Sequence, residues 1–106
     1  MPTFITQIKF SQQGIKEIDH TTKRASIFKT EVKKLGVKVK DIHWTLGDYD
    51  GLPIFESPDN ETATAAILHL GAMGNVHTTT CQAFTAAQMD TIVAKVPRAS
   101  VGRRDH

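Results

Sequence analysis

The chain has 106 residues and a net charge of +2, with 40% hydrophobic and 23% charged residues. These values are those of one ordinary globular domain, and we expect no second one. The single cysteine, Cys81, excludes an intramolecular disulfide and a cysteine-rich zinc or iron–sulfur site. No apolar run approaches the roughly 18 residues that span a membrane, and no signal peptide is evident. We therefore expect a cytoplasmic protein with no membrane partner.

The charges are distributed unevenly along the chain. Residues 1–40 carry nine Lys or Arg against three acids, whereas residues 41–94 carry seven acids and no Lys or Arg. Such a basic segment is typical of a solvated lysine-rich helix, of an anion-binding face, or of a face that meets an acidic one in a neighbouring subunit. The basic residues are not interleaved with aromatic ones and no DNA or RNA motif is present, so nucleic acid is not an expected partner.

The first third of the chain predicts a strand followed by a long helix. Residues 3–10 carry apolar side chains on both phases of a strand, so this strand must be covered on both faces. Apolar residues then recur at helical spacing over residues 15–35, with an interruption near residues 19–22. Gly36 lies where a glycine ends a helix.

The middle of the chain predicts two strands joined by a tight turn. Residues 37–46 return to a period of two. This pattern places Ile42, Trp44 and Leu46 on one face and Val37, Val39 and His43 on the other. "GDYDG" at residues 47–51 supplies glycines and aspartates for the turn, and residues 52–57 resume an extended pattern. Pro53 lacks an N–H, so a gap or bulge is expected there.

A second helix and a fourth strand follow. Ser57 or Asp59 is the expected N-cap, and the apolar positions predict an amphipathic helix that ends at Gly71 and Gly74. Residues 75–84, "NVHTTTCQAF", are rich in residues that favour strands.

The chain ends with a short helix and a basic segment. Thr85 and Gln88 form a capping box ahead of the helix, and Pro97 closes it. Its apolar face comprises Met89, Ile92, Val93 and Val96. We expect residues 1–96 to form a single domain and residues 97–106 to form a flexible basic tail.

The element order is β-α-β-β-α-β with an extra C-terminal helix. This order predicts an α+β, ferredoxin-like fold, in which an antiparallel sheet carries both long helices on one face. Because the first two strands are apolar on both phases, the other face must be covered as well. We therefore predict a homodimer through the sheet faces, a dimeric α/β barrel.

Four stretches carry a resemblance to a known family: "KRA" (23–25), "WTLGDYD" (44–50), "SPDNETA" (57–63) and "LGAMGNVHTTTCQAF" (70–84). Together they resemble the GYD domain family, named for a Gly-x-Tyr-Asp signature that corresponds here to Gly47, Tyr49 and Asp50. The resemblance extends from about Thr3 to Val96. It implies a ferredoxin-like dimeric α/β barrel and no particular activity. Gly51 and Pro53 depart from the family's usual apolar strand after the signature.

The candidate catalytic residues are Tyr49, Asp50 and His43. A phenol and a carboxylate adjacent in a turn can orient and deprotonate a small phenolic or enol substrate. The alternative is structural: Asp50 accepts amide hydrogens of the turn, and Tyr49 packs on the edge of the sheet. His43 is expected on the face opposite Trp44, toward the dimer interface.

The candidate ligand-binding residues are Arg24, Trp44, Gly47 and His77. Arg24 either anchors an anionic group or forms a surface ion pair. Trp44 is either a pocket wall or part of the core. His43 and His77 lie on the two predicted edge strands, so they approach each other only across a dimer. No metal site and no cofactor are predicted.

Three functions agree with these features. The first is a homodimeric module that binds or senses a small molecule in a pocket between sheet and helices. The second is a cofactor-independent oxygenase or isomerase of a small aromatic or lactone-like substrate. The third is a structural or protein-interaction subunit.

Overall fold

The computed structural model describes residues 1–97, and the rest of the predicted basic tail lies outside the described residues. The strands are β1 (Thr3–Phe10), β2 (Lys38–Trp44), β3 (Gly51–Glu56) and β4 (Val76–Ala83). The helices are α1 (Gln12–Lys16), a 3-10 turn η1 (Ile18–His20), α2 (Thr21–Lys33), α3 (Asn60–Ala72) and α4 (Ala86–Ala94). The strands form one antiparallel sheet in the order β2-β3-β1-β4.

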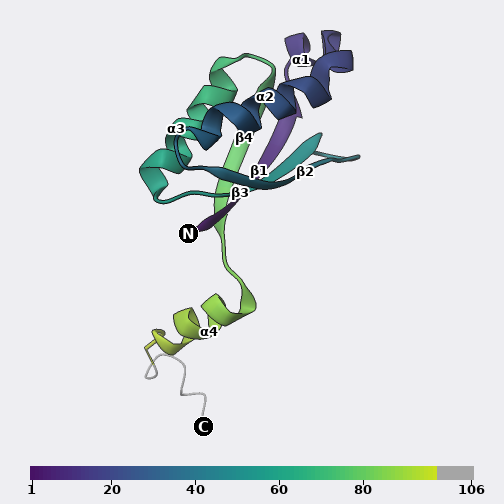
Figure 1. Cartoon of the computed structure of the whole chain (residues 1–106). Helices are drawn as coiled ribbons and strands as arrows, with labels where there is room; N and C mark the ends of the chain where they lie inside the picture. The colour runs from purple at the N-terminus through teal and green to yellow at the C-terminus, as the bar shows by residue number, and fades with distance from the viewer. Residues whose placement is uncertain (98–106) are drawn as a thin grey trace.

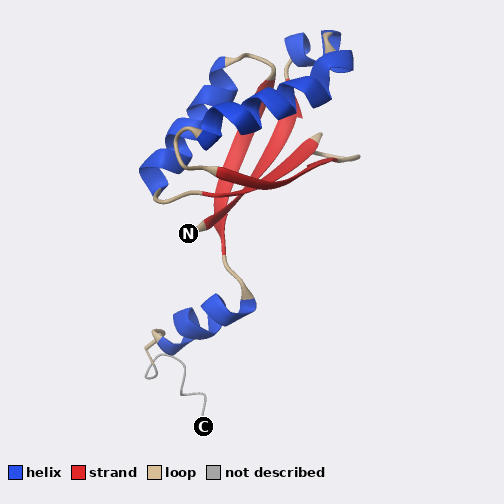
Figure 2. Ribbon diagram, viewed as in Figure 1, coloured by secondary structure: helices blue, strands red, loops and turns tan. Residues whose placement is uncertain are grey.

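The sheet and the two long helices form two layers. Figure 1 shows α2 and α3 side by side across one face of the sheet, and Figure 2 shows none of the described helices on the other face. The predicted α+β, ferredoxin-like architecture is therefore confirmed. Among the described residues, no helix is long and apolar enough to cross a membrane.

The core lies between the sheet and α2 and α3. Its buried hydrophobic members are Phe4, Phe28, Val32, Val37, Phe55, Ala63 and Ala66. Phe4 and Phe55 are partners across β1 and β3, and their rings stack with centroids 5.4 Å apart. Thr6 is fully buried, and its hydroxyl shares a 2.9 Å hydrogen bond with the hydroxyl of Thr80. The hydrogen-bonding capacity of this buried hydroxyl is thus satisfied.

β2 contains a bulge that reverses the predicted phase of its first half. Val39 pairs with Phe55 and Asp41 pairs with Ile54, so one extra residue lies in β2. Val39 packs against the buried core, on the side that Ile42 also faces. The prediction that Val39 and Ile42 face opposite sides was wrong, because an inserted residue shifts the two-residue period by one.

Pro53 lies within β3 without ending it. On the β1 side the paired residues run to Ile5 with Ile54 and resume at Ile8 with Gly51. The interruption falls opposite Pro53, as expected for a residue without an N–H. The strand nevertheless continues through the predicted departure from the family pattern.

The region after β1 is helical earlier than predicted. Ser11 caps α1 by accepting a hydrogen bond from the Gly14 amide at 3.1 Å, so the "SQQG" segment is helical. A Cβ at Gly14 would lie 2.1 Å from the carbonyl oxygen of Asn75, so only glycine fits there. This close approach joins the start of the helical region to the loop before β4.

Most predicted helix ends are confirmed. Gly36 and Gly74 have φ values of +86° and +83°, the left-handed conformation that glycine adopts easily. Gly71 was wrongly predicted as an end, because α3 continues to Ala72. The capping box of Thr85 and Gln88 is confirmed at the start of α4.

Candidate functional site

The turn between β2 and β3 is fastened to the sheet through Asp50. Its backbone amide donates a 2.7 Å hydrogen bond to the carbonyl of Ile8, and its carboxylate accepts one from the amide of Phe10 at 2.8 Å. Within the turn, the Thr45 amide donates to the Asp50 carbonyl at 3.0 Å, and the Thr45 hydroxyl donates to the Tyr49 carbonyl at 2.6 Å. The turn is therefore held at both ends.

Three large side chains are exposed on or beside this turn: Trp44, Leu46 and Tyr49. We call these three residues the turn patch. Leu46 is fully exposed, and the Trp44 indole N–H donates a 3.0 Å hydrogen bond to the Thr21 hydroxyl, which fixes the orientation of the ring. Gly47 has a φ of +126°, so it supplies the left-handed residue that the turn requires.

A cavity of about 70 Å³ lies between the sheet and α2. Its walls are mostly apolar and include Ile8, Phe10, Phe28 and Ile42. An apolar cavity of about 150 Å³ is known to bind benzene, and pockets for drug-sized ligands measure several hundred Å³. A cavity is therefore present where a pocket was predicted, between the sheet and the helices, but it is too small for such ligands.

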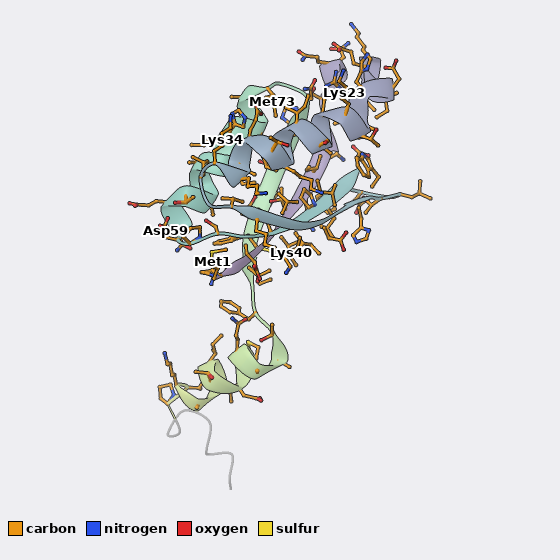
Figure 3. All side chains as sticks on the ribbon, in the orientation of Figure 1. Met1, Lys23, Lys34, Lys40, Asp59 and Met73 are labelled. Carbon is orange, nitrogen blue, oxygen red and sulfur yellow. The ribbon has the colours of Figure 1, made fainter. Side chains whose placement is uncertain are left out.

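Arg24 borders this cavity and is already paired. Its guanidinium donates to the Glu17 carboxylate at 2.7 Å and to the Glu17 carbonyl at 3.1 Å. Arg24 lies on α2. Figure 3 draws the side chains of this helix as sticks and labels Lys23, the preceding residue. Of the two alternatives for Arg24, the structure contains the ion pair.

The two candidate histidines lie apart. His43 borders the cavity, and its Nε2 atom lies 3.2 Å from the Asp41 carboxylate. His77 is on β4, and β2 and β4 are the two edges of the sheet. Within residues 1–97, no group of three or more His, Cys, Asp or Glu side chains is placed to hold a metal ion.

Two features were not anticipated from the sequence. His69 on α3 lies 2.7 Å from the Glu31 carboxylate on α2, so an ion pair can join the two helices. A groove of about 360 Å³ runs between α3 and the edge strand β4. Leu68 lines it, with 67% of its surface exposed.

Comparisons with known proteins agree with these observations. The GYD domain family matches residues 4–93. A protein of Thermus thermophilus, named glutamine synthetase and cystathionine beta-lyase binding protein, is 31% identical over 90 residues, which cover 84% of this chain and 95% of that protein. No solved structure gave a significant match. The fold, the fastened Gly-x-Tyr-Asp turn and these matches together show that the chain belongs to the GYD domain family.

Proposed function

We propose that the protein is a binding module that docks on another protein through the turn patch. The observation that carries this proposal is the exposure of Trp44, Leu46 and Tyr49 on a turn that Asp50 fastens to the sheet. Aromatic side chains are enriched among the residues that dominate protein–protein binding energies. A rigid turn also loses little conformational entropy when it binds.

The partner that we propose is a metabolic enzyme. The Thermus thermophilus relative is named for binding glutamine synthetase and cystathionine beta-lyase, and it matches this chain over 95% of its own length. We therefore infer that one of these two enzymes is the first partner to test. A role in protein binding agrees better with this relative than the expected sensing of a small molecule does.

The polar groups of the candidate site also support binding over catalysis. The carboxylate of Asp50 is engaged by the Phe10 amide, and the guanidinium of Arg24 is engaged by Glu17. In our proposal Asp50 positions the turn, and Tyr49 contacts the partner. The small apolar cavity then contributes to packing beneath α2 and does not hold a substrate.

We also propose that the protein is a cytoplasmic homodimer that pairs through the uncovered face of the sheet. By the alternation of strand residues, Ile5, Leu52 and Ile54 lie at the centre of this face and are half-buried. Charged residues such as Lys38 and Glu56 lie toward its rim. An apolar centre with a polar rim is typical of a protein interface.

The decisive experiment measures binding to purified glutamine synthetase and cystathionine beta-lyase of the same organism by biolayer interferometry. We expect Leu46→Ala and Tyr49→Ala each to weaken binding by at least about tenfold, because truncated hot-spot residues typically cost that much. Leu35→Ala is the matched control. Leu35 is an exposed leucine, as Leu46 is, but it follows α2 and lies outside the turn patch. Equal binding by all three variants and the wild type would overturn the turn patch, and no binding by the wild type would overturn the choice of partner.

A further inference from the structure

Within residues 1–97, the helix α4 buries none of its own residues against the rest of the chain. Figure 1 shows it apart from the sheet and from α2 and α3, and it contains no buried residue. Its nine residues are fewer than the roughly 12–15 that an isolated helix needs for stability in water. The helix is nevertheless capped and apolar along one side, so it requires a surface to pack against.

The apolar side of α4 is suited to a groove. Its members recur at the spacing of one helical face and consist of Met89, Ile92, Val93 and Val96, which we call the α4 stripe. The stripe contains no charged residue, and Val93 is 58% exposed. Such a face is the pattern of a helix that lies in a hydrophobic groove.

The same chain carries a groove of matching character, between α3 and β4. Its apolar lining includes Phe4, Ala63, Ile67 and Leu68, and its polar lining consists of neutral side chains. Leu68 is 67% exposed, so none of the residues that the structure describes fills the groove. A helix with an unmatched apolar face and an unfilled apolar groove thus occur together in one molecule.

We propose that α4 of each copy seats its stripe in the α3–β4 groove of a second copy. Only Phe84 and the N-cap Thr85 separate α4 from β4, and Thr85 is extended, with φ −74° and ψ 169°. This short extended link carries α4 away from its own groove. In such a reciprocal exchange, the α4 stripe of each copy is covered by the groove of the other copy, and each groove is filled. The two contacts are related by a twofold axis, so the assembly is a closed dimer.

This exchange goes beyond the proposed binding of an enzyme and uses other residues than the turn patch. It is also separate from the uncovered face of the sheet, which lies opposite α3. Binding through Leu46 therefore stays measurable in every variant described below. Failure of the exchange and failure of the proposed function are distinguishable.

The test is the monomer–dimer equilibrium of the full chain, measured by sedimentation from micromolar to tens of nanomolar concentration. We expect Val93→Asp in the stripe and Leu68→Asp in the groove each to weaken the dimer by more than about tenfold, because each introduces an unpaired charge into an apolar contact. Thr91→Asp and Ala65→Asp are the matched controls on the same helices. Both residues are exposed and lie outside the stripe and the groove, so dimerisation is expected to be unchanged.

A mixing experiment distinguishes exchange from a helix that folds back on its own chain. Leu68→Lys and Val93→Glu are each expected to dimerise more weakly than the wild type alone but to regain affinity as a heterodimer when mixed, since one exchange contact is then unaltered and the other is a charge pair. Native mass spectrometry identifies the heterodimer by mass, and far-UV circular dichroism verifies the fold of each variant. A monomeric wild type, a dimer insensitive to Val93→Asp and Leu68→Asp, or variants that lose enzyme binding while remaining dimeric would overturn the exchange.

Discussion

The carboxylate of Asp50 accepts a hydrogen bond from the backbone amide of Phe10 at 2.8 Å, which joins the turn after β2 to the end of β1. The two residues are 40 positions apart in the chain. The contact explains why an aspartate follows the tyrosine in this turn: Phe10 pairs with Val76 of β4 on one side, and on the β3 side, where the pairing ends at Ile8, the Asp50 side chain accepts its amide hydrogen. The aspartate of the Gly-x-Tyr-Asp signature therefore has a structural role, because it holds the turn in place.

Replacing Asp50 is expected to lower stability. Asp50→Ala leaves the partly buried Phe10 amide without its charged acceptor, and we expect the free energy of unfolding to fall by about 1–3 kcal/mol. Urea denaturation measures this change. Asp48→Ala is the control, because Asp48 is an exposed residue of the same turn and should change stability by less than about 0.5 kcal/mol. Equal stability of the two variants would contradict the fastening role.

Two glycines are expected to respond to alanine in opposite directions. At Gly14 the added Cβ would lie 2.1 Å from a backbone oxygen of Asn75, so Gly14→Ala must displace the loop before β4 and destabilise the protein. At Gly71, inside α3, nothing lies within 4 Å of the added Cβ. Gly71→Ala should therefore stabilise the helix by about 0.5 kcal/mol. Thermal unfolding followed by circular dichroism measures both, and a tolerated alanine at residue 14 would disprove the close approach.

The hydroxyls of the buried Thr6 and the half-buried Thr80 are expected to be coupled energetically. Thr6→Val should cost about 1 kcal/mol, because the half-buried hydroxyl of Thr80 loses its 2.9 Å partner. The double variant with Thr80→Val removes both polar groups at once. A double-mutant cycle of unfolding free energies should therefore give a total loss smaller than the sum of the single losses. Strict additivity would show that the bond does not contribute to stability.

Acid is expected to weaken the N-terminus of α3. The backbone amide of Thr62 donates to the Asp59 carboxylate at 2.7 Å, and this hydrogen bond holds the pKa of Asp59 below its ordinary value of 3.8. A carboxyl group with a lowered pKa in the folded state contributes stability above the unfolded value, and this contribution is lost as the pH falls through the folded value.

The variant Asp59→Asn provides the comparison, because asparagine caps a helix without titrating in this range. The difference in melting temperature between wild type and variant should be constant above about pH 5 and should shift against the wild type as the pH falls below 3.8. A difference that is independent of pH between about 2 and 6 would contradict the prediction.

The order of the elements and most of their ends followed from local chemistry. The residues that cap the helices bind groups only a few positions away, so their roles can be predicted from the local sequence. They are the N-cap Asp59, the capping box of Thr85 and Gln88, and the left-handed Gly36 and Gly74. The period of two predicted for β1 is preserved in the structure, because its ladder with β4 contains no bulge. The sequence also determined that the face of the sheet away from the helices carries apolar residues.

Contacts between distant segments decided the rest. The bulge in β2 depends on the pairing of Val39 and Asp41 with β3. It reverses which face of the sheet the first half of β2 presents, and the sequence pattern alone does not show this reversal. The start of α1 depends on the approach of Gly14 to Asn75, and the role of Asp50 depends on Phe10. Each of these partners belongs to a different segment of the chain, beyond the reach of a local pattern. Whether α4 packs on its own domain is likewise a question of three-dimensional placement, because an amphipathic pattern shows that a helix needs a partner and does not show where the partner lies.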